Sequence, residues 1–210
     1  MYKVGICGGS CAGKLKVVHA LSGFLGQECF VISQDQYYRD LAHLPPAERA
    51  KMNFDHPNAI EWQLLLSDLA QLEAGCIVHP PLYDFSTHSR RSVSQEITPR
   101  PILLLEGHLL FTSPIFAHLD LKIFVYAPAA VRLQRRLARD IQERGRTAES
   151  IKKQWNMTVL PMHQKFVEPY MMTADFIIPN IGDFNSAPLC LLADGMKQSL
   201  HRVPPELVML

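Results

Sequence analysis

The stretch that decides the fold is Tyr2-Lys3-Val4-Gly5-Ile6-Cys7, followed by Gly8-Gly9-Ser10-Cys11-Ala12-Gly13-Lys14-Leu15. A short apolar run leads into a loop whose spacing from Gly8 to Lys14 matches seven of the eight positions of a phosphate-binding P-loop. Glycines let the backbone curl so that successive N–H groups point at a phosphate, and the following helix adds its positive N-terminal end. The stretch therefore predicts phosphate binding after the first strand of a parallel sheet.

The eighth position departs from the motif. The motif places Ser or Thr after the lysine, because its hydroxyl ligates Mg²⁺, whereas this chain has Leu15, which carries no side-chain oxygen. An ordinary glycine-rich turn is the alternative interpretation. The β-rich residues before the loop and the helix-capable run at 14–25 after it favour the P-loop.

Length, composition and charge limit the remaining classes. The chain has 210 residues, 48% of them hydrophobic, which predicts one core-forming domain at residues 1–203 with a short tail at 204–210. A formal net charge of +1 gives no reason to expect a nucleic-acid or membrane partner. The five cysteines are scattered without a CxxC pair, which favours reduced thiols. The chain shows neither a signal-peptide pattern nor a bilayer-spanning apolar run, so a cytoplasmic location is expected.

Short apolar runs alternate with helical patterns along most of the chain. The expected strands lie at residues 3–7, 29–33, 102–106, 121–126 and 175–179. The expected helices lie at residues 13–25, 60–73, 113–118, 129–144, 148–168 and 185–202. This alternation, with strands that are apolar on both faces, predicts an α/β fold in which helices flank a parallel sheet of the P-loop NTPase type.

Residues 75–100 interrupt the alternation. Two β-prone runs at 76–83 and 92–98 flank a polar turn, which predicts a small hairpin that leans out from the main sheet. Tyr83, Phe85 and His88 lie in or beside that turn, and Phe54-Asp55-His56 forms a similar group. Aromatic rings beside a hydrogen-bonding histidine suit a planar heterocycle, although such clusters more commonly pack within the hairpin itself.

Two carboxylates follow strand ends near the P-loop. Asp35 comes after the second expected strand, at the edge of the sheet where ligands bind. Phosphoryl transfer to a hydroxyl uses such a carboxylate to orient the nucleophile and accept its proton. Glu106 closes the third strand as a Walker-B-like group, whose burial calls for a metal, water or cationic partner. The alternatives are a turn-capping aspartate and an exposed strand terminus.

Arginines cluster on the expected helix at 129–144 and just beyond it: Arg132, Arg135, Arg136, Arg139, Arg144 and Arg146. Periodicity alone favours a solvated face with the i,i+4 ion pairs Arg136–Asp140 and Arg139–Glu143. The functional alternative is an arginine lid, at about residues 132–150, that closes over a transferring phosphate with Gly145 loosening its hinge.

These motifs resemble the uridine kinase (uridine–cytidine kinase) family, and the likeness runs from about residue 3 to about residue 179. The stretches that carry it are Ser33-Gln34-Asp35, Tyr38-Arg39-Asp40, Asn53-Phe54-Asp55-His56-Pro57-Asn58-Ala59, Tyr83-Asp84-Phe85, His88-Ser89-Arg90, Leu105-Glu106-Gly107, Arg135-Arg136, Arg139-Asp140, Glu143-Arg144-Gly145-Arg146, Ala174-Asp175 and Ile177-Ile178-Pro179. Several of these do not belong to P-loop proteins in general. The resemblance implies Mg²⁺-dependent transfer of phosphate from ATP, or GTP, to the 5′-hydroxyl of uridine or cytidine, in pyrimidine salvage and often by a homotetramer.

The resemblance also implies residue roles. Asp35 is the implied base that activates the 5′-hydroxyl, Arg139 is an implied catalytic group on the phosphate, and Asp35 and Glu106 are implied metal ligands. ATP contacts are implied for the P-loop residues 8–15 and for Arg144. Nucleoside contacts are implied for Tyr38, Asp55, Tyr83, Phe85, His88, Arg136, Arg146 and Gln154. Within that set Asp55 holds the ribose hydroxyls, and His88 contacts the edge of the pyrimidine.

Two departures from the family pattern leave the activity open. Leu15 replaces the P-loop Ser or Thr, and Tyr126-Ala127 stands where related kinases usually have Asp-Thr. One hypothesis is an active uridine/cytidine kinase, because the acceptor-site residues and Lys14 are kept. Another is a catalytically impaired, kinase-like protein that binds nucleoside or nucleotide, because losing a direct ligand leaves fewer oxygens for the octahedral shell of Mg²⁺. A related kinase acting on ribulose phosphate or pantothenate is a third, against which the aromatic hairpin argues.

Overall fold

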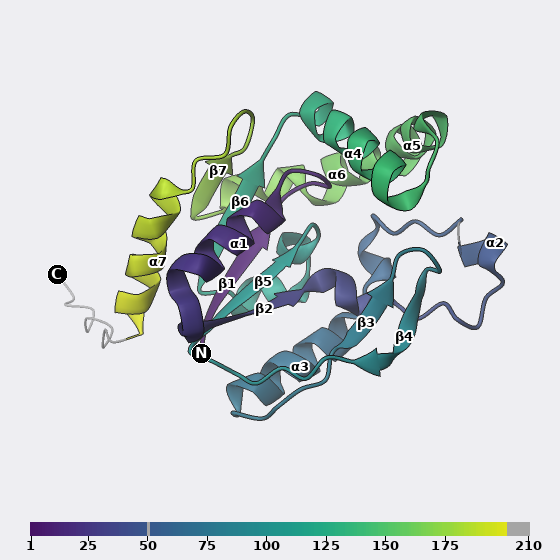
Figure 1. Cartoon of the computed structure of the whole chain (residues 1–210). Helices are drawn as coiled ribbons and strands as arrows, with labels where there is room; N and C mark the ends of the chain where they lie inside the picture. Colours follow the sequence, from purple (N-terminus) through teal and green to yellow (C-terminus); the bar gives the residue numbers. More distant parts are fainter. Residues whose placement is uncertain (50, 201–210) are drawn as a thin grey trace.

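A computed structural model describes residues 1–49 and 51–200 (Figure 1). Its central sheet has five parallel strands in the order β2-β5-β1-β6-β7. Their bounds are β1 Tyr2–Cys7, β2 Cys29–Ser33, β5 Ile102–Gly107, β6 Leu121–Tyr126 and β7 Phe176–Pro179. The α/β prediction is confirmed, and each expected strand differs from the observed one by at most one residue at either end. The expected tail at 204–210 lies outside the described residues, as do 201–203.

Helices cover both faces of the sheet. Their bounds are α1 Lys14–Leu25, α2 Pro46–Arg49, α3 Trp62–Glu73, α4 Ala129–Arg144, α5 Ala148–Gln154, α6 Leu160–Phe166 and α7 Ala187–Ser199. Because side chains alternate along a strand, Leu103 and Leu105 pack with α3, whereas Ile102 and Leu104 pack with α1 and α7. The apolar runs of the strands are thus buried on both sides, as parallel sheets require.

The expected hairpin is present but begins its second strand earlier. β3 Pro81–Asp84 pairs antiparallel with β4 Ser89–Ser94, and an isolated bridge joins Val78 to Ile97 farther along. The Asp84 carboxylate accepts hydrogen bonds from the backbone N–H and the hydroxyl of Ser86, which closes the turn. His88 adopts a positive φ of 52°, and the returning strand starts at the next residue rather than at the expected residue 92.

The helix expected at 148–168 contains a wide turn that was not predicted from the sequence. A π-helical segment, Trp155–Val159, separates α5 from α6, and the Leu160 N–H bonds the Trp155 carbonyl five residues back. Pro161 follows directly. Because proline has no N–H and its ring crowds the preceding turn, a regular α-helix would be strained here, and the wider turn relieves that conflict.

Shorter segments account for the remaining differences. Residues 113–118 form a 3₁₀ turn, Pro114–His118, rather than an α-helix, and the short helix α2 was not expected. The helix expected from residue 60 begins at Trp62, because Ile60 forms a β-bridge with Tyr38. Among the residues described, no helix is both long enough and apolar enough to cross a bilayer.

Candidate active site

A cavity of about 150 Å³ lies beyond the carboxyl ends of the parallel strands. In Figure 1 the hairpin β3–β4 and the helices α4 and α5 stand on opposite sides of this region. The cavity is lined by Ser10, Cys11, Lys14, Asp35, Tyr38, Phe54, Asp55, Tyr83, Phe85, His88, His108, Arg136, Arg139, Arg144, Arg146 and Gln154. Five of these side chains are cationic and two are carboxylates. The surplus of positive charge suits a ligand that carries several negative charges, such as a polyphosphate.

The P-loop forms one end of the cavity. Gly13 precedes α1 with a φ of 98°, in the left-handed region that glycine tolerates best, and so turns the chain from loop to helix. Lys14 folds back so that its ammonium donates to the Gly8 carbonyl at 3.3 Å. Asn180, after β7, supports the loop by donating its amide to the Ala12 carbonyl at 2.7 Å. The side chain of Leu15, 57% exposed, lies outside the cavity.

Asp35 faces the P-loop from the turn after β2. Ser33 caps this turn: its hydroxyl accepts from the Asp35 N–H at 3.3 Å and donates to the Glu106 carboxylate. Burial and the neighbouring negative charge of Glu106 raise the pKa of Asp35 to about 7, although Lys14 and two arginines oppose the rise. A group that titrates near neutral pH is suited to accept a proton at that pH.

The groups around Asp35 also suit a divalent cation. Among the described residues, no cluster of three His, Cys, Asp or Glu side chains is arranged to hold a metal ion alone. Asp35, Glu106 and the hydroxyl of Ser33 are nevertheless oxygen donors that lie together, and the charge of Glu106 disfavours ionised Asp35. A cation bound between the two carboxylates and the oxygens of a nucleotide would relieve that conflict, so the residues fit Mg²⁺.

Aromatic rings form the opposite end of the cavity. The ring of Tyr38 lies 5.0 Å from that of Tyr83 and 6.3 Å from that of Phe85, measured between centroids. His88 stacks on Phe54 at 4.6 Å with an interplanar angle of 15°. Burial, followed by the charge of nearby arginines, lowers the pKa of His88, so its imidazole is neutral at physiological pH. These rings offer faces for stacking and a neutral group for a hydrogen bond, as a heterocycle requires.

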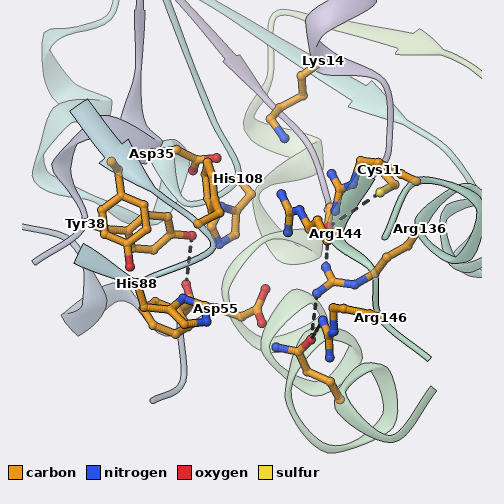
Figure 2. A pocket seen from close by; sticks show the side chains of 16 residues that line it. Cys11, Lys14, Asp35, Tyr38, Asp55, His88, His108, Arg136, Arg144 and Arg146 are labelled. Carbon is orange, nitrogen blue, oxygen red and sulfur yellow. Dashed lines mark hydrogen bonds between the residues drawn. The ribbon is translucent and has the colours of Figure 1, made fainter. Parts of the chain in front are cut away.

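Asp55 lies between the aromatic rings and the arginines (Figure 2). Burial raises the pKa of this carboxylate, while Arg136 and a hydrogen bond from Thr158 act in the opposite direction. A buried carboxylate with few fixed donors is available to accept hydrogen bonds from a ligand's hydroxyl groups.

The arginines of α4 do not share one solvated face: Arg132 and Arg136 are buried, and the expected pair Arg136–Asp140 is present but buried. The buried residues of α4 are Arg132, Arg136 and Asp140, so the stripe that faces inward is polar. Arg136 donates to the Ser10 hydroxyl at 2.8 Å and to the Gln154 amide oxygen at 3.0 Å. Arg139 contacts Asp140 rather than the expected Glu143. The helix keeps this polar face buried because it covers a charged cavity instead of an apolar core.

Fourteen of the residues expected in the site line this one cavity, from the P-loop, the turn after β2, the loop before α3, the hairpin, α4, α5 and the link between these two helices. Of the rest, Gly8, Gly9, Ala12, Gly13 and Leu15 belong to the loop itself, and Glu106 lies behind Asp35. Phe54, from the aromatic group noted in the sequence, and His108, which was not expected there, also line the cavity. His108 follows directly after Glu106 and Gly107 at a strand end, and that position is the signal that points to it.

Comparison with known proteins now identifies the family. The model of the phosphoribulokinase/uridine kinase family matches residues 3–187. The chain belongs to this family. A uridine kinase of Chloroflexus aurantiacus is 42% identical over 203 residues, which cover 96% of this chain and 97% of that protein. A uridine kinase of Clostridium perfringens is 41% identical over 201 residues, with 95% and 96% covered.

A solved structure in the family agrees on the fold. The phosphoribulokinase of Rhodobacter spheroides superposes with a TM-score of 0.64 at 15% identity, covering 90% of this chain and 74% of that one. Membership of the phosphoribulokinase/uridine kinase family agrees with a P-loop lysine that shares one cavity with carboxylates, arginines and aromatic rings.

Proposed function

We propose that the protein is an ATP-dependent nucleoside kinase that phosphorylates the 5′-hydroxyl of uridine or cytidine, in pyrimidine salvage in the cytoplasm. One observation carries the proposal: Asp35, whose pKa is about 7, lies in a single cavity between the P-loop with its arginines and a group of aromatic rings. The names of relatives that match nearly the whole chain at 41–42% identity support a nucleoside as the acceptor.

The proposed roles follow from position. Lys14, Arg139 and Arg144 stabilise the phosphates of ATP, and Asp35 orients the 5′-hydroxyl and takes its proton. Phosphoryl transfer gains most from such positioning and charge stabilisation. Mg²⁺, held by Asp35, Glu106 and nucleotide oxygens, neutralises charge on the phosphates when it is bound.

The nucleoside occupies the aromatic end of the cavity. Asp55 accepts hydrogen bonds from the ribose hydroxyls, while Tyr38, Tyr83 and Phe85 pack on the pyrimidine ring. His88, a neutral imidazole stacked on Phe54, contacts the edge of the base. Arg136, Arg146 and Gln154 close the site from the lid side. We also propose that the protein assembles as a homotetramer.

The deciding experiment measures formation of UMP from uridine with Mg·ATP. Cytidine and GTP are tested as alternative acceptor and donor, and ribulose 5-phosphate and pantothenate serve as unrelated acceptors. Formation of UMP or CMP but no product from the unrelated acceptors is the expected result. Failure of both nucleosides to bind would reject the proposed acceptor. Binding without turnover would instead support the impaired-kinase alternative, which none of the comparisons favours.

A further inference from the structure

Asp140 has no exposed surface, although it lies on the lid helix α4. Its carboxylate contacts four guanidinium groups, those of Arg136, Arg139, Arg144 and Arg146. These are the four arginines that line the cavity, whereas Asp140 is not among the lining residues. Asp140 therefore contacts the cationic groups of the site without facing the space for the ligands.

The two carboxylate oxygens contact different arginines. Oδ1 accepts a hydrogen bond from Arg139 Nε at 2.9 Å, and it lies 2.8 Å from Arg139 Nη2 and 3.8 Å from Arg144 Nε. These are the two arginines whose charges act on Asp35, beside the P-loop. Arg144 also lies over the Phe85 ring, 4.9 Å from its centroid, so the arginines at Oδ1 reach from the P-loop side to the aromatic end of the cavity.

Oδ2 contacts the other two arginines, of which Arg136 donates to the Ser10 hydroxyl in the P-loop. Oδ2 lies 3.5 Å from Arg136 Nε and 3.5 Å from Arg146 Nη1, and has no hydrogen bond of good geometry. The same two arginines share the Gln154 amide oxygen, at 3.0 and 2.6 Å. Gln154 thus orients this pair, and Asp140 holds it by charge. Figure 2 shows Arg136, Arg144 and Arg146 on one side of the cavity and Asp55 and His88 on the other.

Four guanidinium groups held this close repel one another, because arginine stays protonated in proteins. Asp140 is the buried carboxylate that all four share. When Arg139 or Arg144 moves from Oδ1 toward a bound phosphate, the carboxylate is left to neutralise mainly Arg136 and Arg146. The carboxylate is thus a physical link between the two ends of the cavity.

We propose that Asp140 is a positioning residue that couples the two substrate sites, so that a bound nucleotide orders the lid arginines for the nucleoside and the reverse. The inference rests on the proposed kinase function. The side chain of Asp140 can be tested separately from the fold of the lid. The hydrogen bonds that end α4 go from the N–H groups of Gly145 and Arg146 to the main-chain carbonyl of Asp140, which a substitution leaves unchanged.

The experiment compares the wild-type protein with Asp140→Asn, Asp140→Glu and the control Glu149→Gln, which removes an exposed carboxylate of the lid. Calorimetry gives the Kd of uridine with and without a non-hydrolysable ATP analogue, and the ratio of the two Kd values measures the coupling. Because coupling is reciprocal, the Kd of the analogue with and without uridine must give the same ratio. The wild type and Glu149→Gln are expected to bind uridine more tightly with the analogue. In Asp140→Asn the ratio is expected to fall towards one and kcat/KM to fall about 100-fold, as misplaced catalytic groups do. Asp140→Glu is expected to recover part of both.

Inorganic phosphate gives a second measurement that does not depend on kinase activity. Without the carboxylate the four arginines are free to bind an anion, so phosphate is expected to raise the Tm of Asp140→Asn more than that of the wild type. If Asp140→Asn keeps the wild-type Kd ratio, or responds to phosphate no more than the wild type, the inference is wrong. If the wild type binds no nucleoside, the proposed function fails. The Tm gain with phosphate then decides by itself whether Asp140 neutralises the four arginines.

Discussion

Replacing Asp35 by asparagine is expected to slow catalysis strongly and, above neutral pH, to stabilise the fold. Burial and the nearby charge of Glu106 raise the pKa of Asp35 from 3.8 to about 7 in the folded protein. Between these two values the folded chain holds a proton that the unfolded chain has released. The stability contributed by that proton is present in full below the unfolded pKa and is lost as the pH rises through about 7.

The size of the effect follows from the shift. Each pH unit over which the folded state binds one more proton than the unfolded state lowers the free energy of unfolding by ~1.4 kcal/mol. From about pH 5 to about pH 8 the wild type should therefore lose up to ~3 kcal/mol relative to Asp35→Asn, which has no such group to titrate. Solvent contact makes this an upper limit, because the Asp35 side chain is only half-buried.

Urea unfolding of both proteins across this pH range measures the difference. Asp84→Asn is a control without a pH trend in this range: hydrogen bonds from Ser86 lower the pKa of Asp84 from its ordinary value of 3.8, so its contribution is already complete above that value and its loss should weaken the fold equally at both ends of the range. Asp35→Asn should also lower kcat by about 10²- to 10⁴-fold while uridine still binds. An Asp35→Asn stability gain of equal size at both ends of the pH range would refute the buried-carboxylate argument.

Three further substitutions test other parts of the site. Leu15→Thr adds a hydroxyl where the motif places a metal ligand, so the Mg²⁺ concentration needed for half-maximal rate should fall; an unchanged Mg²⁺ titration would show that residue 15 does not set the Mg²⁺ requirement. His88→Ala loses the stack on Phe54 and should weaken uridine binding about tenfold in calorimetry with ATP binding unchanged, and equal losses for both ligands would place His88 outside the nucleoside site. Gly145→Ala meets no neighbouring atom but forces a side chain to a φ of 61°, so unfolding should become easier by ~1 kcal/mol; an unchanged urea midpoint would show that the lid turn adapts without strain.

The sheet is predictable from sequence because burial on both faces leaves a simple pattern. Residues 102–105 of β5 have no exposed surface, and a short run of branched apolar residues in a P-loop protein is typical of a buried parallel strand. The π-helical turn before Pro161 is harder to predict from the sequence. A proline indicates that the helix is disturbed, but it does not indicate whether the helix ends, kinks or widens there. The hairpin register depends on the turn between Asp84 and His88. The sequence alone predicted a longer turn, and it therefore placed the start of the second strand too late.

The site is predictable where its residues follow strand ends, and less so on the lid. Asp35 and His108 occupy positions that the topology of a parallel sheet brings to one edge. Arg136 and Asp140 have the same i,i+4 spacing as a solvated ion pair, and nothing in that spacing says that the pair is buried. Only the packing of α4 over the cavity distinguishes a solvated ion pair from a buried pair on a lid. Periodicity could not make that distinction, and the lid was favoured only by the resemblance to a family.

The substitution at residue 15 separates two properties that a P-loop usually joins. Leu15 directs an exposed side chain away from the cavity, so it removes a possible metal ligand without blocking the space for phosphates. We expect phosphate binding to depend instead on the loop backbone, Lys14, Arg139 and Arg144, all of which are in place. A missing hydroxyl should therefore appear first as a greater need for Mg²⁺ and a lower kcat, with ATP binding largely kept. The arginines held by Asp140 supply the positive charge that makes such a separation possible.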